Sequence, residues 1–266
     1  MGPRVRKLIE FPCAGETLLG TLDEAPGAIG LLIVSGGNEI RIGAHRGMAL
    51  LALRIAEAGH PVFRFDRRGI GDSSGDNRGY DSSADDIAAA AATFRAATGV
   101  TRIVAYGNCD AATALAFFHA PANIDALVLA NPWVIEPTDD LPPVAAIRAR
   151  YAERLRDPGE WLRLVRGGVN IRKLISGLLK LSRSQPQREG GLPARLADAL
   201  GQTQVPVTIL LANGDNTAIA FADAYAGPAF AAARTKASLV ELDSASHSFA
   251  SQSDKDWLFK EVRARL

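Results

Sequence analysis

The stretch "RIVAYGNCDAATALAFF", residues 102–118, decides how the chain folds. Its first part is rich in β-forming residues, and after Gly107 it becomes an alanine-rich segment with helical character. Cys109, one of only two cysteines in the chain, stands at this junction. The stretch therefore predicts a sharp corner between a strand and a helix, with a thiol at its tip.

Short apolar runs alternate with helical patterns on both sides of this corner. The predicted strands cover residues 7–12, 17–23, 30–37, 61–66, 102–107, 124–132, 205–215 and 237–243, and the predicted helices cover residues 45–60, 85–99, 109–120, 218–234 and 254–266. Ala14 and Gly15 separate the first two strands, which predicts a hairpin. The later alternation predicts an α/β fold with a mostly parallel central sheet and helices on both faces.

The alternation stops between residues 137 and 204. This segment has a polar, helical pattern that is interrupted by proline and glycine, and it contains no strand-like run. We therefore expect a core domain made of residues 1–136 and 205–266, and a helical cap or lid made of residues 137–204.

The composition is that of an ordinary globular protein, with 47% hydrophobic and 22% charged residues. A net charge of +1 provides no general attraction to nucleic acid, so we expect no nucleic-acid partner. Two cysteines cannot form a disulfide framework, which favours a reducing compartment. The N-terminus has no secretory pattern and no apolar run approaches membrane-spanning length, so we predict a cytoplasmic protein.

Residues 107–111, "GNCDA", match the nucleophile pattern G-x-S-x-G, with Cys109 in place of serine and Ala111 in place of the last glycine. Small residues at both ends allow the strand and the helix to approach each other. The N-terminus of the helix favours a thiolate over a thiol. The alternative is that Cys109 is a small buried hydrophobic residue, as free cysteines commonly are.

Two further residues complete a predicted catalytic triad. In parallel α/β sheets that carry a nucleophile at such a strand-to-helix corner, the nucleophile comes first along the chain. The acid then follows a later strand, and the histidine follows the last strand. Asp215 is at the carboxyl end of the predicted strand of residues 205–215, and His247 follows the last predicted strand. Asp243 and Glu136 are the alternatives to Asp215 for the acid.

Acyl chemistry also needs N–H groups that bind the developing oxyanion. One donor is expected from Asp110, which follows the nucleophile, and the other from Gly37 or Asn38 in the loop "SGGNEI". A dinucleotide-binding loop is the alternative, but the spacing G-x-G-x-x-G is absent. We expect neither a cofactor nor a metal.

Five segments together resemble the α/β-hydrolase superfamily over nearly the whole chain: "GLLIVSGGNEI", "FRFDRRGIGDSSG", "GNCDA", "LLANGD" and "SASHSF". More narrowly, "EFPCAGETLLGTLDEAPG", "LIVSGGNEIRIGAHRG", "GNCDAATAL" and "NPWVIEPTDDLPPVAAIRARY" resemble the exosortase A system-associated hydrolase 1 family. The first resemblance implies an α/β-hydrolase fold in which residues 137–204 correspond to the variable cap. The second implies a link to bacterial exopolysaccharide and protein-sorting loci, without implying a substrate.

These features predict an enzyme that acts on an ester or thioester through a thioester acyl-enzyme, by hydrolysis or acyl transfer. The expected partner is a small-molecule or carrier-linked acyl substrate. Residues 137–201 hold twelve Lys or Arg against seven Asp or Glu, so the cap could attract an anionic carrier or contact a membrane surface peripherally. A non-catalytic binding or scaffold protein on a hydrolase fold is the alternative. The sequence leaves the oligomeric state open.

Overall fold

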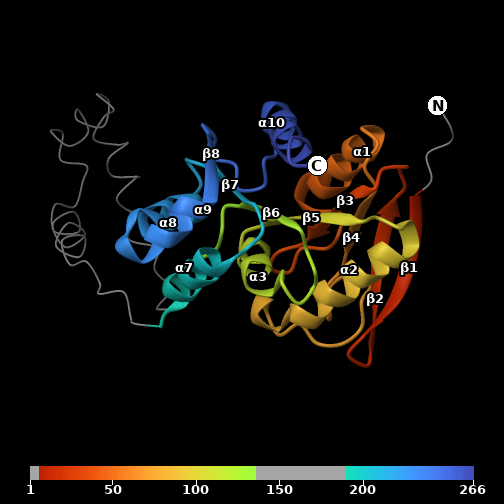
Figure 1. The fold of residues 1–266 in the computed structure, drawn as a ribbon. Helices are drawn as coiled ribbons and strands as arrows, with labels where there is room; N and C mark the ends of the chain where they lie inside the picture. The colour runs from red at the N-terminus through yellow and green to blue at the C-terminus, as the bar shows by residue number, and fades with distance from the viewer. Residues whose placement is uncertain (1–5, 136–189) are drawn as a thin grey trace, which may run out of the picture.

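One sheet organises the chain in the computed structural model, which describes residues 6–135 and 190–266 (Figure 1). Within these residues eight strands pair in the order β1-β2-β4-β3-β5-β6-β7-β8. The strands are β1 (Arg6–Cys13), β2 (Glu16–Asp23), β3 (Ile29–Val34), β4 (Val62–Phe65), β5 (Arg102–Asn108), β6 (Ala126–Ala130), β7 (Val207–Ala212) and β8 (Ala237–Leu242).

The direction of the strands confirms the predicted mostly parallel sheet. β1 and β2 form an antiparallel hairpin that turns at Ala14 and Gly15, both with positive φ, and β2 pairs antiparallel with β4. From β4 through β3 and β5 to β8, all neighbouring strands are parallel. The carboxyl ends of these six strands therefore lie at one edge of the sheet, where the loops that follow them can meet.

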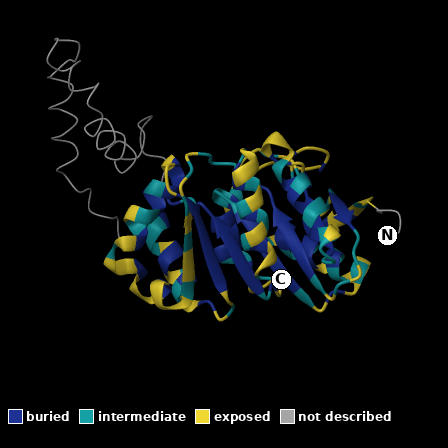
Figure 2. Ribbon diagram, turned by 90° about the horizontal axis from the view of Figure 1, so that it is seen from above, coloured by how far each residue is buried: buried dark blue, intermediate teal, exposed yellow. Residues whose placement is uncertain are grey.

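Helices cover both faces of this sheet, as predicted. The described α-helices are α1 (Gly47–Glu57), α2 (Ala84–Thr98), α3 (Asp110–Phe118), α7 (Leu192–Gln202), α8 (Asn216–Ala226), α9 (Ala231–Lys236) and α10 (Gln252–Arg263), and the short 3₁₀ segments are η1 (Ala44–Arg46), η2 (Tyr80–Ser82) and η3 (Pro228–Phe230). α1 and α10 pack together on one face, and α2, α3 and α7 to α9 contribute to the core of the other. In Figure 2 the buried strands lie between helices whose outer sides are exposed.

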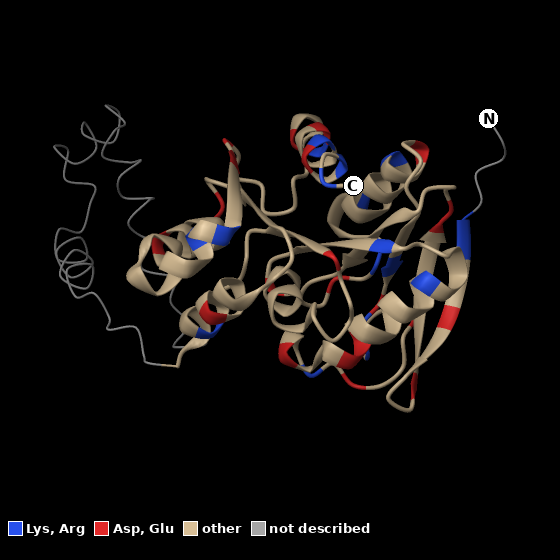
Figure 3. Cartoon of the chain, in the orientation of Figure 1, with Lys and Arg blue, Asp and Glu red and all other residues tan. Residues whose placement is uncertain are grey.

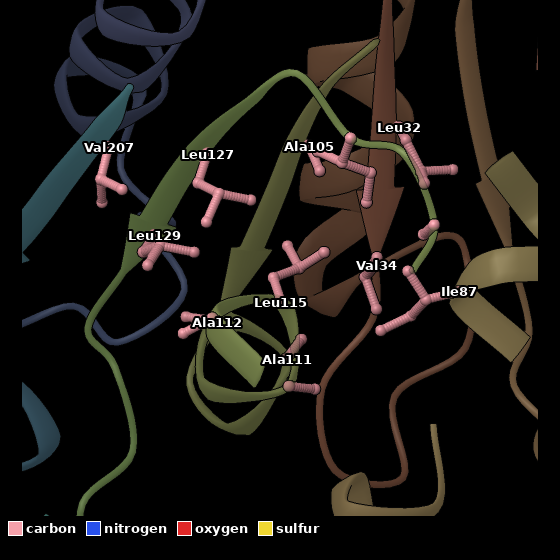
Figure 4. Close-up of a cluster of buried hydrophobic side chains, with 14 of the residues drawn as sticks. Leu32, Val34, Ile87, Ala105, Ala111, Ala112, Leu115, Leu127, Leu129 and Val207 are labelled. Atoms are coloured by element: carbon pink, nitrogen blue, oxygen red, sulfur yellow. The ribbon is translucent and has the colours of Figure 1, made fainter. Parts of the chain in front are cut away.

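Two apolar clusters fill the space between the sheet and its helices. On the α3 side, Leu115 packs among side chains of β3, β5 and β6 (Figure 4). Ala111 and Ala112 face the sheet at the start of this helix, so the helix axis can approach the strands closely. Each large side chain buried in this way contributes about 1.5–3 kcal/mol to folding.

Both acidic and basic side chains are found on helix α10 (Figure 3).

Two predicted helix boundaries are wrong. The helix expected over residues 218–234 is broken, because α8 ends at Ala226 and Gly227 is extended, with φ −68° and ψ 163°. Pro228 explains the break, since proline has no N–H and disfavours helical backbone in the residue before it. The helix expected from residue 45 begins at Gly47, because His45 and Arg46 have left-handed backbone with φ of 51° and 60°.

Most of the predicted cap lies outside the described residues. Of residues 137–204, the structure describes 190–204, and there α7 packs against α3 and α9. Leu196 and Leu200 of α7 are buried in the same apolar cluster as α3. The C-terminal part of the predicted cap, which includes α7, is therefore in contact with the core helices. None of the described helices combines the length and the apolar character that crossing a bilayer requires.

The corner between β5 and α3 depends on close backbone packing. A Cβ atom at Gly107 would lie 2.8 Å from the carbonyl carbon of Ala111, which is closer than real contacts allow. Gly107 therefore lets the first turn of α3 lie directly against the end of β5. This contact fixes where Cys109 stands relative to the sheet.

Replacing Gly107 with alanine should destabilise this corner. We expect Gly107→Ala to lower the free energy of unfolding by about 1–3 kcal/mol, because the added methyl group meets backbone atoms that cannot move aside. Gly47→Ala is the matched control, since Gly47 has helical backbone and its Cβ would meet nothing closer than the Ser248 carbonyl oxygen at 3.9 Å. Urea unfolding measures both, and equal effects at the two sites would contradict the prediction.

Candidate active site

Cys109 occupies a strained position at the tip of the β5–α3 corner. Its φ of 62° and ψ of −127° lie in a region that residues other than glycine rarely adopt. Its N–H donates to the carbonyl oxygen of Ala130 at 3.0 Å, and its own carbonyl accepts from the N–H of Trp133 at 3.2 Å. Such a conformation costs about 1–3 kcal/mol and persists where surrounding contacts enforce it, which is common at active sites.

The other cysteine lies in a very different environment. Cys13 is buried near the hairpin, and its thiol donates to Asp86 Oδ1 at 3.3 Å. Burial, together with the neighbouring Asp86 carboxylate, raises the pKa of the Cys13 thiol to about 12. Cys13 is therefore protonated and unreactive at neutral pH, whereas Cys109 is only partly buried.

Asp215 and His247 come together from two different loops. His247 Nδ1 lies 2.9 Å from Asp215 Oδ2. The same oxygen accepts the N–H groups of Thr217 and Ala218 at 3.1 and 3.2 Å, because Asp215 caps the N-terminus of α8. These bonds hold the buried carboxylate in one orientation toward the imidazole. Asp215 rather than the alternative Asp243 is thus the acid beside His247, and Glu136 lies outside the described residues.

The side chain of Cys109 also influences the imidazole of His247. The pKa of His247 is raised to about 10 by the hydrogen bond to Asp215 first and by a hydrogen bond with Cys109 next, although partial burial acts in the opposite direction. Since Nδ1 is engaged by Asp215, Nε2 is the ring nitrogen left for the sulfur. The structure therefore brings together the three residues that were predicted from separate parts of the sequence.

Two asparagines that the sequence analysis did not identify hold the His247 loop in place. The carbonyl oxygen of His247 accepts from Asn108 Nδ2 at 3.0 Å and from Asn131 Nδ2 at 3.3 Å. Asn131 is fully buried, and its Oδ1 accepts the N–H of Ala212 at 2.9 Å. These bonds tie the ends of β5, β6 and β7 to the loop that carries the histidine. Both asparagines follow apolar strand residues, which is the one signal in the sequence that could have suggested them.

The predicted oxyanion donors differ in what they bind. Asp110 is the first residue of α3, so its N–H has no acceptor within the helix. For the N–H of Asn38, no acceptor is found in the part of the chain that the structure describes. The N–H of Gly37 donates to Asp110 Oδ1 at 2.7 Å. Gly37 could therefore serve an oxyanion only after this bond has been broken.

Arg67 holds the same loop from the other side. Its guanidinium donates to the carbonyl oxygen of Gly37 at 2.6 Å and to Ser83 Oγ at 2.9 Å, and it lies 3.9 Å from the Asp110 carboxylate. The N–H of Gly37 is thus held by Asp110, and its carbonyl group is held by Arg67. The neighbouring Arg68 pairs instead with Asp86.

Glu39 is a further carboxyl group near the triad that sequence reasoning missed. It lies in the loop after β3 and accepts the N–H of Ala44. Burial raises the pKa of Glu39. The charge of His247 lowers this pKa and the charge of Asp110 raises it, but both effects are smaller than that of burial. No group of three or more potential metal ligands is found among residues 6–135 and 190–266.

Comparisons with known proteins give the same architecture. An esterase of Pyrococcus furiosus is similar at 15% identity, with 98% of this chain and 90% of that chain covered and a TM-score of 0.67. The thioesterase domain from the curacin biosynthetic pathway is similar at 17% identity, with 98% and 99% covered and a TM-score of 0.57. A dienelactone hydrolase from Anabaena variabilis is similar at 14% identity, with 98% and 96% covered and a TM-score of 0.61.

Identities this low establish the likeness of the fold alone. No curated protein matches the chain. The model of the family described as "Alpha/beta hydrolase family" matches residues 31–261, which include the sheet from β3 to β8, the Cys109 corner and the loops of Asp215 and His247. Because this match spans most of the sequence, the chain belongs to the α/β-hydrolase family.

Proposed function

We propose that the protein is an enzyme that acts on an ester or thioester through Cys109, His247 and Asp215, and that the acyl group passes to water or to another acceptor. The observation that carries this proposal is the imidazole that is hydrogen-bonded to a carboxylate and whose pKa is raised by Cys109, a cysteine at a strained strand-to-helix corner. A structural cysteine requires none of these three features.

The geometry supports a mechanism in two stages. In the first stage, His247 holds the proton that leaves Cys109, and the sulfur attacks the carbonyl carbon of the substrate. The tetrahedral intermediate then collapses, the bond to the leaving alcohol or thiol breaks, and His247 donates its proton to that group. In the second stage, His247 takes a proton from water or from the acceptor, which attacks the thioester and releases Cys109.

Asp215 keeps the imidazole in the orientation that both stages require, and its charge stabilises the imidazolium. The oxyanion that forms at each stage needs N–H donors aimed at it. We assign the first donor to Asp110 and the second to Asn38. The Gly37 N–H would join them if the Asp110 side chain released it.

A thioester intermediate permits both hydrolysis and acyl transfer. A thioester reacts with alcohols and amines as well as with water, so the acceptor that reaches Cys109 decides the product. The solved structures with similar folds include an esterase and a thioesterase domain by name, which supports the ester or thioester class.

The cellular role that we propose follows from the sequence resemblance to the exosortase A system-associated hydrolase 1 family. It is an acyl-processing step in the bacterial cytoplasm that serves exopolysaccharide or protein sorting. The basic residues that would attract an anionic carrier or a membrane surface lie mostly outside the described residues.

Covalent trapping tests the nucleophile directly. Incubation with an activated ester such as a p-nitrophenyl acyl ester should increase the intact mass by one acyl group, because the thioester forms faster than it is hydrolysed early in the reaction. Cys109→Ala should abolish this adduct, whereas Cys13→Ala should keep it. Asp215→Asn should slow acylation by a factor on the order of 10²–10⁴. An adduct that survives in Cys109→Ala, or no adduct with any ester, would favour a binding or scaffold protein instead.

The raised pKa of His247 gives a second test. A nuclear magnetic resonance titration should find an imidazole pKa of about 10 in the wild type, compared with the usual 6.5. We expect a lower value in Cys109→Ala and a still lower value in Asp215→Asn, because the Asp215 hydrogen bond is the largest cause of the shift. Titration of the wild type near 6.5 would contradict the arrangement.

The same shift predicts how stability depends on pH. A folded-state pKa above the unfolded value stabilises the protein fully below pH 6.5, and this contribution is lost as the pH rises toward about 10. His247→Gln should therefore destabilise the protein most below pH 6.5, and the difference from wild type should shrink as the pH rises toward about 10. The effect should be small, because 42% of the side chain is exposed and solvent screens it. Urea unfolding at several pH values measures it.

A further inference from the structure

A cavity of about 150 Å³ lies between α1 and α10, on the face of the sheet opposite α3. Its apolar lining comes from both helices, from β5 and from the loop after β8: Met48, Leu50, Leu51, Tyr106, Phe249 and Leu258. Two polar ends bound this apolar middle. The lining residues named here all belong to the described core.

One polar end of the cavity lies beside the triad. It is lined by Asn108, which precedes Cys109, and by Ser248, which follows His247. Glu39 lines the same end and interacts electrostatically with His247. The sequence neighbours of both Cys109 and His247 therefore border the cavity.

The other polar end lies toward the outside, between Arg54 of α1 and Lys255 of α10. Arg54 is held in place by Asp256 at 2.7 Å and stacks over the ring of Phe259, with 4.1 Å from its guanidinium carbon to the ring centroid. A long apolar chain would have to pass these charged groups. The apolar part of the cavity consequently has a limited length.

The size and lining of the cavity indicate the chemistry of its occupant. Met48, Leu51, Phe249 and Leu258 are all at least 93% buried, so the walls between the two ends are apolar and well packed. An apolar cavity of about 150 Å³ is large enough to hold benzene, which has six carbon atoms. A small aliphatic group of similar size fits the same space.

We propose that the cavity between α1 and α10 binds the acyl chain of the substrate and selects apolar acyl groups of about six carbons. This proposal rests on the proposed function, since it places the chain of the acyl group that Cys109 accepts. Burial of each methylene favours binding by a factor of about four, so selection between a two-carbon and a six-carbon acyl group can be strong.

The acylation rates of a series of p-nitrophenyl esters test the proposal. In the wild type, kcat/KM should rise about fourfold per methylene from acetyl to hexanoyl and should stop rising at octanoyl. Gly47→Leu adds a side chain that fills the opening, because a Cβ at Gly47 faces free space next to Ser248. This variant should lose at least about tenfold with hexanoyl ester and keep its rate with acetyl ester.

Two further variants control for indirect effects. Leu53→Phe adds bulk to the same helix at a position that does not line the cavity, so it should leave the chain-length profile unchanged. Leu50→Ala lengthens the cavity and should move the optimum toward octanoyl. A flat wild-type profile, or an unchanged profile in folded Gly47→Leu, would overturn the proposal.

Binding without chemistry separates this proposal from the function on which it rests. In Cys109→Ala, 1-hexanol should bind the cavity, as calorimetry or protein resonance shifts can measure, and Gly47→Leu in the same background should abolish that binding. Absence of hexanol binding would overturn the cavity assignment even if Cys109 is acylated. Hexanol binding together with no acylation by any ester would refute the proposed function instead, and with it the role of the cavity in holding an acyl chain.

Discussion

The site depends on the backbone of Cys109, which is forced into a conformation that cysteine avoids by itself. Its positive φ lifts the side chain out of the line of β5 and starts α3 in the next residue. Hydrogen bonds of Cys109 to Ala130 and Trp133 hold this conformation, and the absence of a side chain at Gly107 permits it. The rest of the fold can be understood as the support that this corner needs, because the parallel sheet brings the neighbouring strand ends to the same edge.

Buried polar groups at this edge turn separate loops into one site. Asn108 and Asn131 hold the carbonyl of His247, and Asp215 holds its ring while it also caps α8. A buried amide or carboxylate is costly unless its partners are correctly placed, so each of these groups favours a single arrangement of the loops. Asp110 has a comparable dual position, since its N–H begins α3 and its carboxylate holds Gly37.

Much of the fold could be predicted from the sequence, because strand and helix patterns are local. The continuous apolar runs identified the buried strands, and the alternation with helices indicated the parallel sheet. Local patterns were less reliable at helix ends. The helix predicted to run through Gly227 and Pro228 is broken there, and the left-handed backbone of His45 and Arg46 delays the start of α1.

The sequence by itself determined the residue types and their order: a cysteine at a strand-to-helix corner, then an aspartate and a histidine after later strands, within an α/β-hydrolase core. Only the tertiary structure decided which groups meet. It selected Asp215 over Asp243, engaged the Gly37 N–H with Asp110, and formed the cavity beside Asn108 from α1 and α10. The physical reason is that these contacts join residues far apart in the chain, whereas sequence patterns record the preferences of near neighbours.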